Sequence, residues 1–347
     1  MIYTLTFIKI LKYVKEKYDF VIALKSGEKI FVSFPLFNLN KYNVIAQPRK
    51  LSEGNWAGAP SVVYDGDSDE YWLVYRVRDV VERGIEIHIA KSKDGLRFKD
   101  ELILTREDLG DQVISVERSS ILKNPNNGKF MLYISYEKDF ARGSFPKKYG
   151  RRGRWVISKF EDVDDPRDFD PNTLRTVLTG SPGSVDNASV KDPYVFAIGK
   201  IYLMYYIGAG TFEQTFLAYS NDGIKWEKYS GNPVFTLGGW HDYATRPCSI
   251  LPIRNGFLLI YGGSNVDWYA PVYNIASGFA YTQDFKNFID LTPISPVLTS
   301  PTSNKYKTVR YCDVLKEESR ILLYYEVARI DDAFETRVSF ISIDNER

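Results

Sequence analysis

The chain has 347 residues, 44% of them apolar, which is enough for one large or two ordinary domains with a sizeable core. Its 45 basic and 44 acidic residues leave a formal charge of +1, so no global field would draw it to nucleic acid or to a membrane surface. With only two histidines and two cysteines, we expect neither a metal centre nor another cofactor. The 25 Tyr, 21 Phe and 6 Trp favour strands over helices.

The first residues, "MIYTLTFIKILKYVKEKYDF", begin apolar but carry lysines at positions 9, 12, 15 and 17. These charges interrupt the segment before a signal peptide can form. No later stretch reaches the roughly 20 uncharged residues of a membrane span. We therefore expect a soluble, cytoplasmic protein. Residues 1–41 are predicted to be an extension, made of a helix or strand plus a hairpin, that packs on the outside of the main domain.

Five segments of the remaining chain can be laid over one another, which indicates a repeat fold. Each holds a short apolar strand, a tight polar turn and a second apolar strand, as in "KDPYVFAIGKIYLMYYIG". This pattern predicts an antiparallel hairpin. The five hairpins span residues 58–78, 117–137, 191–208, 246–264 and 310–328.

A third strand with its own signature follows the hairpins, as in "IAKSKDGLRF" and "LAYSNDGIKW", and a fourth, outer strand is predicted at "ELILT", "RTVLT", "NPVFT" and "SPVLT". Four strands repeated five times predict an all-β fold, a five-bladed β-propeller formed by residues 42–347 as one domain. Residues 42–48 resemble the missing outer strand of the last blade, so this N-terminal strand would close the ring and remove an open sheet edge. A pair of β-sandwich domains is the alternative, but it does not explain five copies in register.

The functional face is predicted from loop lengths. The start of the first strand and the end of the second lie on the same face of each hairpin, and the long connections after the second strand lie there too. The strand starts bring Gly58, Glu117, Lys191, Arg246 and Arg310 into one register. One position further along stand Ala59, Arg118, Asp192, Pro247 and Tyr311, and Asp313 follows in blade 5. Such charges could be structural pairs between blades, but their convergence from four of five blades favours function.

Two stretches carry a resemblance to a known group of proteins. "VKDPYVF" (190–196) is similar to the Asp-Pro strand starts of glycoside hydrolase family 43, and "WAGAPSVVYDGDSDEYWLVYR" (56–76) is similar to the first blade of family 130. With the blade pattern, the chain resembles the five-bladed β-propeller glycosidases of families 32, 43, 62, 68 and 130 over roughly residues 42–344. The resemblance implies a carbohydrate-active enzyme.

The chain departs from both families at the residues that act in them. Families 32 and 43 place an acid at the start of the first blade, where this chain has Gly58-Ala59-Pro60. Family 130, largely phosphorylases of mannosides, dispenses with that acid because phosphate is the nucleophile. Its second blade carries Val-Glu-Asp-Pro-Arg, with the aspartate as proton donor. Here "VERSS" (116–120) puts Arg118 at that position, so the donor would be Glu117 or Asp192.

The chemistry of glycosidic cleavage assigns roles to the acids. It needs a protonated carboxylic acid at the leaving oxygen and, in hydrolases, a second carboxylate. Glu117 or Asp192 is predicted as the acid, and Asp313 as the base or an orienting residue. Arg118 and Lys191 would lower the pKa of a nearby acid, whereas burial would raise it.

Cations and aromatic residues near this face are predicted to bind the substrate. The cations would hold phosphate or a sugar carboxylate, or else they neutralise the acids. The aromatic rings would stack on sugar rings. These residues are Arg76, Arg118, Lys191, Arg246, Arg310 and His241, with Trp56, Trp240, Trp268 and Tyr269. By contrast, Trp72, Trp226, Cys248 and Cys312 are predicted to belong to the core.

The sequence therefore predicts an enzyme that hydrolyses glycosidic bonds in an oligosaccharide or glycoside. Phosphorolysis with inorganic phosphate is an open alternative. A non-catalytic propeller that binds a sugar or a protein is the other, because a fold alone does not confer activity.

Overall fold

The structure is a computed structural model that describes residues 5–14, 17–24, 29–138, 154–187, 189–210, 212–269 and 274–343. Side chains are described from residue 29 on, without those of residues 33–35 and 269. Nearly every regular element is a strand, as the aromatic and β-branched composition predicts. The helical turns in the described ranges are η2 (Pro166–Asp168), η3 (Pro171–Thr173) and α1 (Val266–Tyr269).

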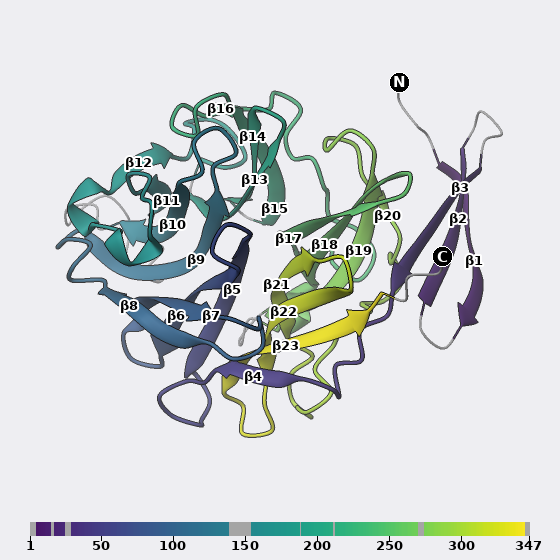
Figure 1. Ribbon diagram of the computed structural model, residues 1–347. Coiled ribbons are helices and arrows are strands. Elements are labelled where there is room, and N and C mark those ends of the chain that lie inside the picture. The colour runs from purple at the N-terminus through teal and green to yellow at the C-terminus, as the bar shows by residue number, and fades with distance from the viewer. Residues whose placement is uncertain are drawn as a thin grey trace.

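From residue 56 on, the strands follow one another in antiparallel groups (Figure 1). The first is β5 (Trp56–Asp65), β6 (Glu70–Asp79), β7 (Arg83–Ser92) and β8 (Lys99–Thr105). The second is β9 (Val113–Lys123), β10 (Phe130–Lys138), β11 (Arg154–Lys159) and β12 (Arg175–Leu178). The third is β13 (Ser189–Ile198), β14 (Ile201–Ala209), β15 (Glu213–Ser220) and β16 (Glu227–Lys228).

The fourth group is β17 (Ala244–Ile253), β18 (Gly256–Ser264), β19 (Ala276–Thr282) and β20 (Ile289–Asp290). The last is β21 (Val309–Lys316), β22 (Arg320–Ala328) and β23 (Phe334–Ser342). The strand β4 (Asn43–Ala46) pairs antiparallel with β23, as the sequence of residues 42–48 predicts. Each group therefore begins with one of the five predicted hairpins.

The first strand of each group is its inner strand. β5 lies against β9, β9 against β13, β13 against β17, β17 against β21, and β21 against β5. A repeated hydrogen bond joins these strands, because the side chain at one register accepts the backbone N–H of the next strand. Ser61 accepts from Ile121 (3.1 Å), Ser120 from Val195 (2.9 Å), Tyr194 from Ile250, and Asp313 from Val62 (2.8 Å). Ser249 departs from the pattern, since its Oγ has no partner among the described residues.

Two predicted outer strands are shorter than expected. β8 and β12 coincide with "ELILT" and "RTVLT", but "NPVFT" and "SPVLT" make only isolated bridges, and the paired outer strands there are the two-residue β16 and β20. The physical reason lies in Pro233 and Pro296, which have no N–H to donate to a ladder. At the first of these positions the Asn232 side chain bonds the backbone N–H and C=O of Leu217 in place of a strand (2.7 and 2.8 Å).

The core lies between neighbouring groups. Trp72, Val74 and Ile89 of the first group pack against Leu132 and Phe130 of the second. Burial of such a side chain stabilises the fold by about 1.5–3 kcal/mol. Cys248 and Cys312 are buried free thiols, and Trp226 is partly buried beside the core, as predicted.

The N-terminal segment forms an antiparallel sheet, with no helix in its described part. Its strands are β1 (Leu5–Val14), β2 (Lys17–Leu24) and β3 (Lys29–Pro35). Figure 1 shows this sheet beside the main body, with β3 nearest to it. Val32, Phe37 and Leu39 attach the segment, because they are buried among residues of β17 and β21.

Candidate functional site at the mouth of the inner strands

We call the end at which the inner strands begin the mouth. All five inner strands have a register shift of the β-bulge kind near this end. On three of them a bulged residue, Ala59, Asp192 or Tyr311, has φ between +51° and +56°. A positive φ is rare for residues other than glycine and costs roughly 1–3 kcal/mol each. Bulges of this kind turn a side chain in a new direction and are frequent next to active sites.

One charged cluster surrounds Glu117 on β9. Arg76 Nε donates to Glu117 Oε2 (2.9 Å), and Arg78 Nη1 donates to Oε1 (3.5 Å). A second carboxylate, Glu326 on β22, lies 3.1 Å from Arg76 Nη2 and accepts from Arg310 Nε (2.7 Å). The cluster therefore joins three arginines to two glutamates, all but Arg78 less than a tenth exposed.

The protonation of this cluster follows from its charges. Burial raises the pKa of Glu117, but Arg76, Arg78 and Arg310 outweigh it and hold the pKa below its ordinary value. Burial and the neighbouring arginines lower the pKa of Arg78 to about 10, although Glu117 opposes them. Arg76 Nη1 and Arg78 Nε have no hydrogen-bond partner within the described ranges. Glu117 is therefore ionised at neutral pH, and the cluster has one more positive than negative charge.

A second cluster surrounds Asp192 on β13. The Tyr311 hydroxyl donates to Asp192 Oδ2 (3.0 Å), and Ser135 Oγ lies 3.4 Å from Oδ1. Arg246 Nη1 donates to the Tyr311 oxygen (3.1 Å), while its Nε donates to Glu213 Oε2 (2.7 Å). Lys191 lies 2.8 Å from the other oxygen of Glu213.

Asp192 differs from Glu117 in its environment. It is fully buried, and among the described residues it makes no ion pair. Burial raises its pKa, the charges of Glu117 and Glu213 raise it further, and Lys191 and Arg246 only partly oppose them. The pKa values of these two carboxyl groups on neighbouring inner strands are thus shifted in opposite directions. The shift favours the protonated form of Asp192 and the ionised form of Glu117.

Asp313, predicted as a base, belongs to the hydrogen bonds between inner strands. Its Oδ2 accepts from the backbone N–H of Val62 (2.8 Å), and its Oδ1 accepts from Val314 N–H (3.0 Å). Burial raises the pKa of Asp313 to about 6, although Arg118 and these N–H groups oppose the shift. Its contacts are those of a structural residue, and its role as a base stays a prediction.

Arg118 crosses from β9 to β17. Its Nη1 donates to the carbonyl of Pro247 (2.8 Å) and its Nη2 to that of Cys248 (2.6 Å). The side chain is fully buried, and its guanidinium carbon lies 5.5 Å from the centre of the Tyr194 ring. These contacts fasten two inner strands of non-adjacent groups to each other.

The remaining predicted residues are placed as follows. His241 is buried, its Nε2 lies 2.8 Å from Asp290 Oδ2, and its ring contacts those of Phe235 and Tyr261. Trp56 stacks on Phe334 (5.1 Å between centroids), and Arg78 covers the ring at 4.0 Å. Trp240 is buried, and its Nε1 donates to a backbone carbonyl (2.7 Å). Trp268 packs against Trp240, and the side chain of Tyr269 lies outside the described part.

Three mouth residues were missed by sequence reasoning: Glu213, Glu326 and Arg78. Tyr311 was placed at the register of Asp192 but was given no role. Glu326 had a signal, because it occupies on β22 the position that Arg76 occupies on β6. Arg78 is two residues beyond Arg76 on the same face of β6. Glu213 opens a third strand, a position that the repeat comparison left out.

A third polar cluster, separate from those around Glu117 and Asp192, lies outside the mouth on β7 and its neighbours. His88 Nε2 lies 3.0 Å from Glu86 Oε2, and His88 Nδ1 lies 2.9 Å from Asp100 Oδ2. The Tyr75 hydroxyl donates to Asp100 (2.9 Å), and Arg49 pairs with Glu86. Burial lowers the pKa of His88, but the two carboxylates outweigh it and raise the pKa overall.

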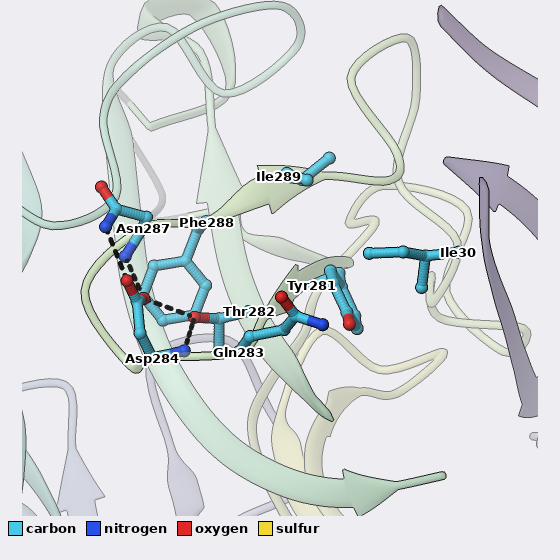
Figure 2. A pocket seen from close by; sticks show the side chains of 8 residues that line it. All are labelled: Ile30, Tyr281, Thr282, Gln283, Asp284, Asn287, Phe288 and Ile289. Atoms are coloured by element: carbon cyan, nitrogen blue, oxygen red, sulfur yellow. Dashed lines mark hydrogen bonds between the residues drawn. The ribbon is translucent and has the colours of Figure 1, made fainter. Parts of the chain in front are cut away.

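A small cavity of about 40 Å³ lies at the far end of β19 from the mouth (Figure 2). It lies between Ile30 of β3 and the turn after β19. In that turn Asp284 Oδ1 accepts from the N–H groups of Lys286 and Asn287, as Asp94 and Asp222 do in their own turns. The cavity is thus a junction with the N-terminal sheet and is separate from the mouth.

The residues that the structure describes contain no cluster of three His, Cys, Asp or Glu able to hold a metal ion. Within the same ranges, no helix is long and apolar enough to cross a membrane.

Comparison with known proteins gives the fold. No family model and no curated protein matches the sequence. Among solved structures, one titled "Glycoside hydrolase" is similar at a TM-score of 0.65 and 14% identity, covering 88% of this chain and 93% of that one. An α-L-arabinofuranosidase from Lactobacillus brevis is similar at 0.59 and 15%, covering 86% and 94%. A β-1,2-mannobiose phosphorylase from Listeria innocua is similar at 0.56 and 14%, also covering 86% and 94%. The predicted all-β fold is confirmed, and the chain is folded like these glycoside-cleaving proteins.

Proposed function

We propose that residues 42–347 form one domain, a five-bladed β-propeller closed by β4, with residues 1–41 as an extension. Three observations support this: the contact of each inner strand with the next, the repeated hydrogen bond between them, and the pairing of β4 with β23. In this arrangement the mouth is the funnel of the propeller, and residues of remote sequence position converge there.

We propose that the protein is a carbohydrate-active enzyme that cleaves glycosidic bonds by hydrolysis. The observation that carries this proposal is the pair of buried carboxyl groups, Asp192 and Glu117, whose environments favour opposite protonation states. Such a pair is what an acid and a base acting on the same bond require. Its position at the mouth of a fold shared with glycoside-cleaving proteins supports the same conclusion.

In this proposal the two carboxyl groups have different catalytic roles. Asp192, which retains its proton to higher pH than an exposed aspartate, would protonate the leaving oxygen as the glycosidic bond breaks. The resulting carboxylate would be stabilised by the Tyr311 hydroxyl. Glu117, ionised and held by Arg76, would act on the attacking water or stabilise the positive charge that develops on the sugar.

Phosphorolysis is the second candidate, and the charge at the mouth favours it. The cluster around Glu117 has three guanidinium groups for two carboxylates, and two of its buried donor atoms have no partner in the described ranges. An anion would balance this charge, and phosphate is the anion that a phosphorylase uses. The name of one similar structure, a mannobiose phosphorylase, shows that this fold accommodates such chemistry.

A non-catalytic, sugar-binding propeller is the third candidate. It is favoured by the two arginines that already engage Glu117, since a carboxylate tied in ion pairs is a common structural feature. We also propose a cytoplasmic location, with no nucleic-acid or membrane partner. The near-neutral charge and the two free buried thiols support it.

One experiment separates these candidates. The wild type is assayed on a panel of glycosides with and without inorganic phosphate, beside Glu117→Gln, Asp192→Asn and the control Asp164→Asn, an exposed carboxylate on a turn of the second group. We expect the wild type to turn over a glycoside and each mouth variant to be at least 100-fold slower. The control should retain the wild-type rate. Sugar 1-phosphate formed only with phosphate would establish phosphorolysis. Binding of a glycoside without turnover would establish the third candidate, and full activity in both mouth variants would contradict the assignment.

A further inference from the structure

Tyr311 and Asp192 occupy equivalent positions on two inner strands. Both are bulged residues with positive φ, on β21 and β13, and both are buried. Neither strand follows the other directly, because β17 lies between them. Two strained backbone positions thus direct a phenol and a carboxyl group toward each other across the mouth.

The hydroxyl of Tyr311 is the central member of a chain of hydrogen bonds. It accepts from Arg246 Nη1 (3.1 Å) and donates to Asp192 Oδ2 (3.0 Å). Arg246 is itself fixed by Glu213, whose Oε2 accepts its Nε at 2.7 Å. Since the guanidinium can only donate, the single hydroxyl proton of Tyr311 must point at Asp192.

We propose that Tyr311 is a positioning residue that orients the carboxyl group of Asp192 and sets its affinity for a proton. The proposal rests on the proposed function, in which Asp192 is the general acid. A hydroxyl that donates to a carboxylate favours its ionised form. Tyr311 therefore offsets part of the effect of burial, so that Asp192 gives up its proton to the leaving oxygen more readily.

Tyr311 itself does not exchange its proton in this scheme. Burial raises its pKa well above the ordinary value, and the charges of Asp192 and Glu117 raise it further, whereas Arg246 and Arg310 only partly oppose them. It remains a donor throughout the working pH range. Tyr311 therefore affects the orientation and the acidity of Asp192, and it does not act as a second acid or base.

The test is the substitution Tyr311→Phe, which removes only the hydroxyl. The protonation of Asp192 is followed by its carboxylic-acid band in infrared spectra at a series of pH values, with Asp192→Asn used to identify the band. We expect the midpoint to rise by about one pH unit, the effect of losing one hydrogen bond to a charged group. Tyr133→Phe is the matched control, because that buried hydroxyl donates to the Gly223 carbonyl instead (2.6 Å). An unchanged midpoint in Tyr311→Phe overturns the proposal.

A second variant covers the case in which Tyr311→Phe does not fold. Arg246→Lys keeps a positive charge near Glu213 but removes the fork that fixes the Tyr311 hydroxyl, and we expect a smaller shift in the same direction. No shift there counts against the proposal.

Where a glycoside is turned over, the alkaline limb of the kcat/KM profile should move upward with the infrared midpoint. A midpoint shift without turnover of any glycoside contradicts the proposed function and still supports the coupling of Tyr311 to Asp192. Turnover with an unmoved alkaline limb in Tyr311→Phe supports the function and overturns the role of Tyr311.

Discussion

Asp313→Asn tests whether the carboxyl group on β21 is a structural residue. In the native protein its two oxygens accept the N–H groups of Val62 and Val314. Asparagine keeps an oxygen for one of them and turns an amide group toward the other. The variant has this defect at every pH, whereas the wild type has it only while the aspartate is protonated. The informative quantity is therefore how the difference in unfolding free energy between wild type and variant changes with pH.

The size of that change follows from the pKa of Asp313, which burial raises from 3.8 to about 6. Between these values the folded protein retains a proton that the unfolded chain has released, so the wild type loses stability as pH rises. A difference of about two pH units corresponds to about 3 kcal/mol. At pH 4 the unfolded aspartate is already partly ionised, so relative to Asp313→Asn the wild type should lose about 2.4 kcal/mol between pH 4 and pH 7.

Urea unfolding of both proteins at pH 4, 5, 6 and 7 measures this quantity. Effects of pH on other groups cancel, because both proteins share them. A difference that is constant over the range, or that grows in favour of the wild type, would refute the reasoning. Loss of glycoside turnover in a variant of native stability would restore Asp313 to the catalytic groups.

Three further predictions concern residues with structural contacts. Arg118→Met should lower the unfolding free energy in urea by about 3–5 kcal/mol, because it leaves two buried carbonyl groups unpaired. Native stability together with a loss of sugar binding would instead show that Arg118 binds the sugar. Folding raises the pKa of His88, so the wild type should exceed His88→Gln in unfolding free energy most below about pH 6.5. This excess should fall as pH rises further, and an excess that does not change with pH would contradict the ion pairs of His88. Ser120→Ala should lower the unfolding free energy by about 1–2 kcal/mol, because it removes the acceptor for the Val195 N–H. Ser249→Ala removes no described bond and should lower it less. Equal losses would argue against the repeated hydrogen bond.

The sequence was sufficient for the five hairpins and for their order. Hydrophobic alternation and polar turns place all five hairpins, and the match of residues 42–48 to an outer strand anticipates the pairing of β4 with β23. The outer strands predicted at "NPVFT" and "SPVLT" form only isolated bridges, because proline has no N–H to pair.

The site was predicted less well, because its contacts depend on geometry that the register alone does not contain. Tyr311 was aligned with Asp192, but only the bulges on both strands direct the two side chains toward each other. The charge of Asp313 suggested catalysis, although at its register the neighbouring strands use hydroxyl groups to hold a backbone N–H. Arg118 is long enough to reach a strand two groups away, which a comparison of equivalent positions cannot reveal.

The bonds between the two ends of the chain have a consequence for its synthesis. Val62 and Asp313 are 251 residues apart, Ala59 and Glu326 are 267 apart, and Ala57 and Thr336 are 279 apart. β5 therefore leaves the ribosome long before the C-terminal strands that it bonds exist. Contacts this distant in sequence make folding slow, and an uncovered strand edge invites pairing with other chains. A chain that ended before β23 would leave β22 unpaired over Arg320–Ala328, so we expect such a product to aggregate instead of forming a smaller stable protein.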